Sequence, residues 1–219
     1  MSNPTPVHIS IVLDRSGSMK RIAGDIVGGF NQFLRKQRET EGEAKVTLVQ
    51  FDSEDPFEIL IDGIPLREVT DLDTAAYQPR SLTPLYDAVG RMILRIDGQV
   101  TSRRKLGLSE EDQVVLIVTD GLENASSDYT RSQVFSMVSE RREQGWVFVF
   151  LGADQDVYAE GDKVGVASAN RVSWEKTKSG SEKMWKDVAY STSSYRTKAD
   201  YLRRRDSDQF HEEDPEADS

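Results

Sequence analysis

Three oxygen-bearing side chains at alternate positions follow the first apolar run of the sequence. Residues 7–13 form that run, and Asp14, Ser16 and Ser18 come directly after it, with Gly17 between the serines. A mostly apolar run of this length predicts a strand covered on both faces, and Gly17 allows a sharp turn. In such a turn the three side-chain oxygens can converge on one point. Oxygen-only ligands suit a hard cation such as Mg²⁺, so the segment predicts a metal site.

The pattern Asp14-x-Ser16-x-Ser18 after an apolar strand resembles the metal-ion-dependent adhesion site (MIDAS) of von Willebrand factor type A (VWA) domains. In that family a threonine and an aspartate from two later loops complete the ligand set. This chain offers both in the expected order, with Thr83 at a Thr-Pro helix start and Asp120 at the end of an apolar strand. The resemblance therefore implies one divalent ion, Mg²⁺ or else Mn²⁺ or Ca²⁺, held by Asp14, Ser16, Ser18, Thr83 and Asp120.

An α/β fold is indicated twice, by the sequence pattern and by the resemblance. Strands alternate with amphipathic helices, which predicts a three-layer α/β/α sandwich with a mainly parallel sheet. The resemblance covers roughly residues 6–200 and implies a Rossmann-like, six-stranded sheet of order 3-2-1-4-5-6 with one antiparallel edge strand. The strands that end at Asp14 and Asp120 are then neighbours where the strand order reverses. Ligands of open α/β sheets bind at that point.

Hydrophobic periodicity and turn signals place the individual elements. Residues 46–51 and 57–61 are expected to form a hairpin, the second being the antiparallel edge strand, and 62–82 an irregular loop. The other expected strands are 114–119, 146–151 and 166–172. Helices are expected over 19–38, from Thr83-Pro84 onward, from Thr130 to Gly145, over 174–190 and over 195–205.

The chain of 219 residues predicts a single VWA domain at 1–205, with its core at about 6–172 and C-terminal helices at 173–205. Residues 206–219 hold seven acidic side chains and no lysine or arginine, which predicts an acidic disordered tail. Without these seven, the formal charge of −10 becomes about −3. Such a balanced body gives no indication of a nucleic-acid partner.

The sequence also bears on the compartment. It contains no cysteine, its N-terminus lacks a signal-peptide pattern, and no apolar run approaches the ~18 residues of a membrane span. We therefore expect a cytoplasmic protein without membrane contact. By resemblance it is similar to the intracellular bacterial members of the family.

The resemblance implies a function in binding. In the family the serine hydroxyls ligate directly, the aspartates act largely through water, and the threonine ligates in the state competent for ligand. Hydroxyls are neutral, so the dication keeps much of its charge and attracts a carboxylate into its open position. The chain is thus expected to be a metal-dependent protein-interaction module that binds an Asp or Glu of a partner, and not an enzyme.

The same residues also fit other interpretations. Taken singly, Ser16 and Ser18 also fit helix caps, Thr83 an N-cap and Asp120 a turn. The Asp14-x-Ser16 opening is similar to that of haloacid-dehalogenase phosphatases, which use a metal in phosphotransfer or hydrolysis, but that family needs a second aspartate at position 16. The acidic tail is a candidate for self-contact with the metal site. Glu123 and Asn124 fit either a place at the site, in a supporting role or facing a partner, or plain solvation or turn formation. Asp52 and Ser53 are interpreted as a solvated loop, with a place bordering the site as the alternative.

Overall fold

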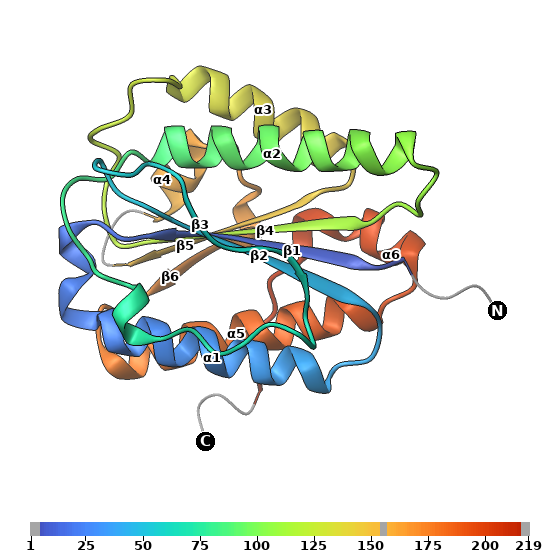
Figure 1. Ribbon diagram of the computed structural model, residues 1–219, viewed down its shortest axis with the longest axis horizontal. Coiled ribbons are helices and arrows are strands. Elements are labelled where there is room, and N and C mark those ends of the chain that lie inside the picture. Colours follow the sequence, from blue (N-terminus) through green and yellow to red (C-terminus); the bar gives the residue numbers. More distant parts are fainter. Residues whose placement is uncertain (1–4, 154–156, 216–219) are drawn as a thin grey trace.

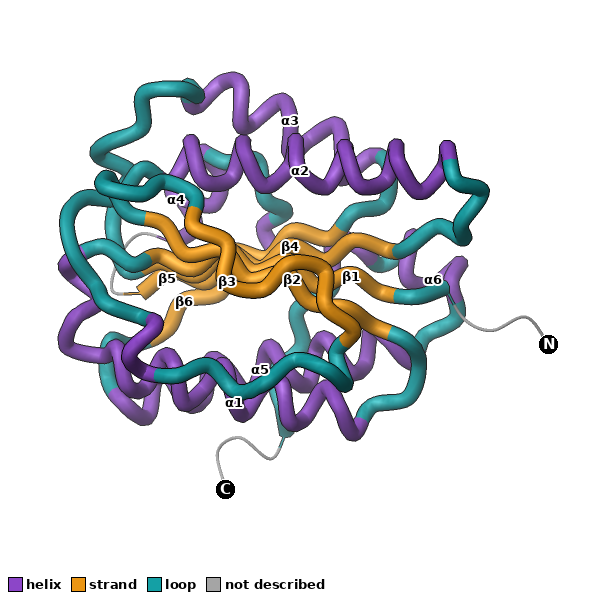
Figure 2. The backbone as a smooth tube through the Cα atoms, viewed as in Figure 1, coloured by secondary structure: helices purple, strands orange, loops and turns teal. Residues whose placement is uncertain are grey.

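The computed structural model describes residues 5–153 and 157–215 and shows one sheet between two layers of helices (Figures 1 and 2). The six strands lie in the order β3-β2-β1-β4-β5-β6. They are β1 (Val7–Asp14), β2 (Ala44–Phe51), β3 (Glu58–Pro65), β4 (Asp112–Thr119), β5 (Val147–Ala153) and β6 (Arg171–Trp174). The α-helices are α1 (Ala23–Glu39), α2 (Leu85–Lys105), α3 (Arg131–Glu143), α4 (Val157–Lys163), α5 (Lys178–Thr197) and α6 (Asp200–Arg205).

The sheet has the predicted order and the predicted mixture of directions. β1 pairs in parallel with β2 on one side and with β4 on the other, and β5 and β6 continue the parallel part. β3 pairs antiparallel with β2, as expected for the second strand of a hairpin. The three-layer, mostly parallel sandwich of order 3-2-1-4-5-6 is therefore confirmed.

Successive side chains of the central strands point alternately into two separate hydrophobic cores, one on each face of the sheet. Ile9, Ile11 and Leu13 of β1 lie in one cluster with residues of α1 and α5. Val12 lies in the other cluster, with residues of α2 and α3. Figure 1 shows the same division, with α2 and α3 on one side of the sheet and α1 and α5 on the other. Because both faces are covered, every residue of β1 is buried, which explains the apolar run in the sequence.

The observed helices differ from the predicted ones mainly in where they begin and end. The helix expected from 19 starts as a 3₁₀ turn, Gly17–Ile22, and becomes α1 only at Ala23. Thr130 caps α3 through a reciprocal pair of hydrogen bonds with Gln133, as the sequence signal indicated. The sequence also offers Asp154 as a cap for a short helix that Gly165 ends, and Asp154 lies outside the described residues.

Two predicted boundaries near the C-terminal end are wrong. The last strand covers 171–174 instead of 166–172, because a 3₁₀ turn at Ser168–Asn170 precedes it. The helix α5 starts at Lys178, where the Thr177 hydroxyl accepts the Gly180 amide, instead of at 174. It then runs without interruption through the break that was predicted at 190–195. α6 is a separate short helix.

The segment after α6 is folded against the body, in contrast to the disordered tail expected from residue 206. Phe210 is 2% exposed and packs against Tyr195 with ring centroids 5.4 Å apart. The side chain of Asn170 accepts the amide of Phe210 at 2.8 Å, and Ser191 Oγ donates to the carbonyl of Glu212 at 2.8 Å. One buried aromatic ring and these backbone contacts thus hold 207–215 in place despite its acidic composition.

Helices α1 and α5 meet closely on their shared side of the sheet. A Cβ built on Gly29 of α1 would lie 2.0 Å from Cδ1 of Trp185, so the indole occupies the space that any larger residue would need. Glycines at 24, 28 and 29 inside a predicted helix favour close packing, for which the sheet is the expected partner. The partner is instead the indole of α5.

None of the helices in the described part of the chain has both the length and the apolar character needed to span a membrane.

Candidate metal-binding site

Asp14 ends β1 and its carboxylate is held by uncharged donors. The side chain is completely buried. Oδ1 accepts the backbone amide of Ser16 at 2.6 Å, and Oδ2 accepts the Thr119 hydroxyl at 2.6 Å. The Tyr77 hydroxyl donates to the backbone carbonyl of Asp14. These contacts give the carboxylate one orientation at the carboxyl edge of the sheet.

Burial dominates the electrostatics of this carboxylate. The pKa of Asp14 is raised to about 6, because burial and, to a smaller extent, the nearby Asp120 outweigh the hydrogen bonds from Thr119 and Ser16 that lower it. Among the described residues, no lysine or arginine forms an ion pair with Asp14. A cation placed here would therefore stabilise the ionised form.

The two serines connect Asp14 to Asp120. Ser16 Oγ and Ser18 Oγ are 3.0 Å apart, and Ser18 Oγ donates to Asp120 Oδ1 at 2.6 Å. Ser16 stands at the N-cap position of the 3₁₀ turn but makes no side-chain capping bond. Its hydroxyl is thus directed to the other site residues. Ser18 is exposed, whereas Asp14 and Ser16 are buried, so the cluster opens to solvent on the Ser18 side.

Thr83 lies next to the Asp120 loop. Its amide donates to Asn124 Oδ1 at 2.9 Å, and the Asn124 amide donates back to the Thr83 carbonyl at 3.2 Å. The N-cap of α2 is Pro84, without a side-chain capping bond, so the hydroxyl of Thr83 does not serve as a cap. Asn124 therefore positions Thr83, one of the two roles that the sequence left open for it.

The oxygens of three separate loops converge above Gly121. A Cβ built on Gly121 would lie 3.0 Å from Thr83 Oγ1, 3.6 Å from Ser18 Oγ and 3.7 Å from Asp14 Oδ2. The hydrogen bonds of Ser18 place Ser16 and Asp120 in the same cluster. The structure thus brings together all five residues singled out in the sequence.

This donor set fits a hard divalent cation. It offers two carboxylates and three hydroxyls, without nitrogen or sulfur ligands. Among the described residues there is no group of three or more carboxylate, imidazole or thiol side chains that could hold a metal. A metal at this edge therefore depends on the hydroxyl groups of Ser16, Ser18 and Thr83.

The surrounding charges include groups that the sequence pattern did not reveal. Asp52 is fully buried and pairs with Arg15 Nε at 2.7 Å and Arg80 Nε at 3.0 Å, so its interpretation as a solvated loop residue is wrong. Lys176, from the loop before α5, reaches Asp120 Oδ2 with its ammonium nitrogen at 2.7 Å. The contact between Lys176 and Asp120 could not be predicted from a local sequence pattern, because more than fifty residues separate the two.

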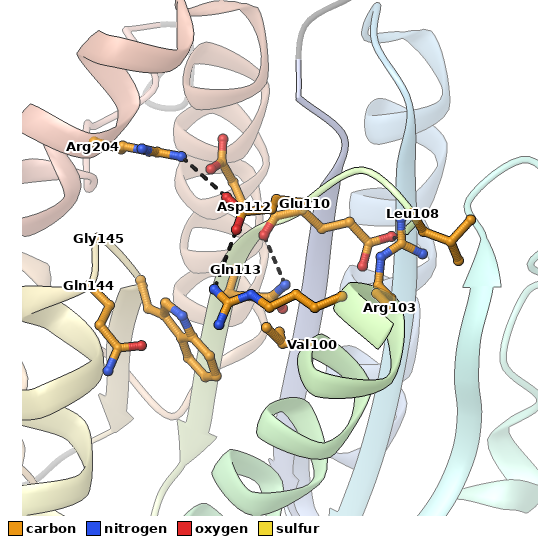
Figure 3. Close-up of a pocket in the computed structure, with 12 residues that line it drawn as sticks. Val100, Arg103, Leu108, Glu110, Asp112, Gln113, Gln144, Gly145 and Arg204 are labelled. Atoms are coloured by element: carbon orange, nitrogen blue, oxygen red, sulfur yellow. Dashed lines mark hydrogen bonds and ion pairs between the residues drawn. The ribbon is translucent and has the colours of Figure 1, made fainter. Parts of the chain in front are cut away.

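The opposite edge of the sheet holds a small cavity with mixed charges. Its volume is about 80 Å³, and Figure 3 shows Arg204, Glu110 and Arg103 around it. Arg204 lies 3.7 Å from a carboxylate oxygen of Glu110, and Arg103 lies 3.2 Å from one of Glu111. Charges at this edge are therefore paired within the chain.

The acidic residues after α6 pair with basic residues elsewhere on the body. Asp208 contacts Arg142 at 2.9 Å and Glu212 contacts Lys198 at 2.9 Å. The carbonyl of Glu212 accepts the hydroxyl of Ser191, which lies thirteen residues after the start of α5 at Lys178, so Glu212 lies on the order of 20 Å from that end of the helix.

Comparisons of sequence find no family model and no curated protein that matches this chain. Comparison of the fold does find solved structures. Proximal thread matrix protein 1 from the mussel byssus is 16% identical over 87% of this chain and 46% of its own, with a TM-score of 0.59, and one of its structures has a zinc-occupied MIDAS motif. A von Willebrand factor type A protein from Catenulispora acidiphila is 9% identical over 86% of this chain and 43% of its own, with a TM-score of 0.61.

The vWF domain of the type V pili tip protein Mfa5 from Porphyromonas gingivalis is 12% identical and has a TM-score of 0.60. It matches over nearly the whole length of both, 91% of this chain and 99% of that domain. Our chain spans less than half of the mussel and Catenulispora proteins. With the strand order 3-2-1-4-5-6 described above, these similarities show that the chain has the fold of von Willebrand factor type A domains.

Proposed function

We propose that this protein is a metal-dependent protein-interaction module, with Mg²⁺ held by Asp14, Ser16, Ser18, Thr83 and Asp120. The observation that carries the proposal is the convergence of oxygens from three loops above Gly121, beside a buried carboxylate that pairs with no lysine or arginine among the described residues. The zinc-occupied MIDAS motif of the mussel protein, which has the same fold, supports the assignment of a divalent ion.

The proposed ligand is an Asp or Glu side chain of a partner protein. Three of the five donors are neutral hydroxyls, and Lys176 lies 2.7 Å from Asp120 and offsets one of the two carboxylate charges, so a bound dication would keep part of its charge and attract an anion. Ser18 is exposed and lets such an anion approach. Leu82 and Leu122, each next to a site loop, are 52% and 55% exposed and are available to contact apolar residues beside the acidic one.

We further propose that the protein binds its partner without catalysing a reaction, and that it does so in the cytoplasm of a bacterium. The absence of cysteine from the sequence is consistent with that compartment. A self-contact of the acidic C-terminus is not part of the proposal, since Asp208 and Glu212 pair elsewhere on the body.

Calorimetric titration with Mg²⁺ and Mn²⁺ tests the metal site. We expect binding by the wild-type protein and its loss in Asp14→Ala and in Thr83→Ala, since each variant removes an oxygen donor. Thr101→Ala, at an exposed position of α2, is the matched control and should bind as the wild type does. Equal metal binding by all four proteins would contradict the proposal.

Gly121→Ala tests the geometry of the same site without removing a donor. The added methyl group would lie 3.0 Å from Thr83 Oγ1 and compete with an ion for that space. We expect affinity for Mn²⁺ to fall by about tenfold, which corresponds to about 1.4 kcal/mol. Unchanged affinity would place the ion elsewhere.

Affinity capture from the source cells tests the partner. Acidic partners should be retained on the wild-type protein with Mg²⁺ and released with EDTA, and they should be missing from the Asp14→Ala eluate. A partner that stays bound in EDTA would show that recognition does not depend on the metal.

A further inference from the structure

Lys176 brings a positive charge into the candidate site from a separate part of the chain. Its ammonium nitrogen is 2.7 Å from Asp120 Oδ2. The Asp120 side chain is fully buried, while that of Lys176 is 23% exposed. Among the described residues, Lys176 is the charged group in contact with this oxygen. The other oxygen of the carboxylate accepts Ser18 Oγ.

The loop that carries Lys176 is tightly held. It connects β6 to α5, and the amide of Thr177 donates to the carbonyl of Glu175 at 2.7 Å. Thr177 Oγ1 then accepts the amide of Gly180 at 3.0 Å, which fixes the start of α5. β5 lies between β4, which leads to Asp120, and β6, which leads to Lys176. Its residue in register with Thr119 and Ser173 is Gly152, which has no side chain. The lysine is therefore built into the site by its surroundings.

We propose that Lys176 weakens the binding of the metal alone and strengthens the carboxylate binding that follows, so that the site favours metal and carboxylate together; this inference rests on the proposed function. Asp14 and Asp120 together carry two negative charges, and the ammonium of Lys176 reduces this to one. A bound dication brings the net charge of Asp14, Asp120, Lys176 and the metal together to +1. A carboxylate from the partner then restores neutrality.

The two affinities therefore respond to Lys176 in opposite directions. The ammonium repels the metal ion, so it weakens metal binding in the absence of an acidic ligand. It attracts the incoming carboxylate, so it strengthens the binding of that ligand once the metal is present. Coupling of this kind is reciprocal: a carboxylate must tighten the metal site by the same factor by which the metal tightens carboxylate binding.

The experiment is a titration with Mn²⁺ in chloride buffer and in acetate buffer, at equal ionic strength and corrected to free Mn²⁺. Acetate is the probe for the partner's carboxylate. Lys176→Met removes the charge and keeps most of the side-chain volume. Lys176→Arg keeps the charge. Lys178→Met is the matched control, because Lys178 lies two residues away with a side chain that is 74% exposed.

In the wild-type protein, acetate should tighten the binding of Mn²⁺. In Lys176→Met we expect Mn²⁺ to bind about tenfold more tightly in chloride, and the enhancement by acetate to fall by about threefold or more. Lys176→Arg and Lys178→Met should resemble the wild type in both buffers. A lysine that merely supports the fold would instead lower both affinities when it is replaced, and thermal unfolding without metal detects such a loss.

The outcomes separate the two proposals. If the wild type binds Mn²⁺ and Lys176→Met binds it equally well or more weakly, the inference about Lys176 is overturned while the metal site stands. An unchanged acetate effect in Lys176→Met overturns the inference as well. If neither protein binds Mn²⁺, the proposed function fails and the inference fails with it.

Discussion

The two edges of the sheet surround a carboxylate in different ways: Asp14 is fully buried, and the side chain of Asp112 is 10% exposed. At the amino-terminal edge, Asp112 contacts the guanidinium of Arg203 at 3.0 Å, and Arg203 is almost completely buried. The same guanidinium donates to the carbonyls of Thr5 at 2.7 Å and Tyr195 at 3.0 Å. At the carboxyl edge, Asp14 accepts hydrogen bonds from an amide and a hydroxyl, and no lysine or arginine among the described residues pairs with it. Figure 1 shows α6, which carries Arg203, at the end of the molecule where β1 begins.

The difference separates a structural carboxylate from one that is available for binding. Burial raises the pKa of both groups, but an arginine acts against this only at Asp112. A buried charge is costly unless a counter-charge and hydrogen bonds compensate it. The chain provides the counter-charge for Asp112, whereas Asp14 obtains one from a bound cation if the proposed function is correct.

Removal of the arginine should have the largest effect on stability. Arg203→Met leaves the half-buried Asp112 without its partner and removes the bonds to the carbonyls of Thr5, Tyr195 and Arg196. We expect the free energy of unfolding to fall by about 3–5 kcal/mol, as measured by urea denaturation. Arg204→Met is the control, since that side chain is 62% exposed and its loss should cost at most about 0.5 kcal/mol. A similar small loss in both variants would remove the distinction between the edges.

Neutralisation of the two carboxylates should change stability in opposite directions. In metal-free buffer at pH 7, Asp14→Asn removes a buried charge whose pKa is raised from 3.8 to about 6, so we expect stabilisation by up to about 2 kcal/mol. Asp112→Asn leaves Arg203 without its partner and should destabilise the protein. Urea denaturation of both variants measures the two signs. Destabilisation of similar size in both would contradict the comparison.

A histidine at the amino-terminal edge, His8, should make the free energy of unfolding depend on pH. Burial, together with the positive charges of Lys45, Arg103 and Arg95, lowers the pKa of His8 to about 3. Between pH 6.5 and this value the unfolded chain binds the proton and the folded protein does not, so stability falls as the pH falls. The expected loss is about 1.4 kcal/mol per pH unit.

His8→Gln provides the reference for this measurement. Glutamine can keep the contact with Thr47, which lies 2.8 Å from the imidazole, and it does not titrate. The free energy of unfolding should therefore fall more steeply between pH 6.5 and 5.5 in the wild type than in the variant. Equal slopes would show that His8 is not the group responsible.

The sequence predicts the parts of the molecule that rest on local signals. β1 and β4 are covered on both faces and read as apolar runs, so the ends that carry Asp14 and Asp120 could be located. Thr130 and Gln133 form a capping pair within four residues, and the start of α3 was correct.

The features that were missed depend on contacts between distant residues. Phe210 is one aromatic residue in an acidic segment, and only the three-dimensional fold shows that it packs against Tyr195. The partners of Asp52, Asp112 and Asp120 are likewise long-range. Composition shows that arginines and lysines are present but not which carboxylate each one meets.

The contact between Gly29 and Trp185 bears on how the site can move. The indole fills the space above the glycine and lies against Phe30 and Phe33, so sliding of α5 along α1 would force a ring into backbone. A rearrangement at Lys176 must then be absorbed by the short loop ahead of α5. The emission of this tryptophan should accordingly stay constant when Mn²⁺ binds, and a spectral shift would reveal sliding of α5 along α1.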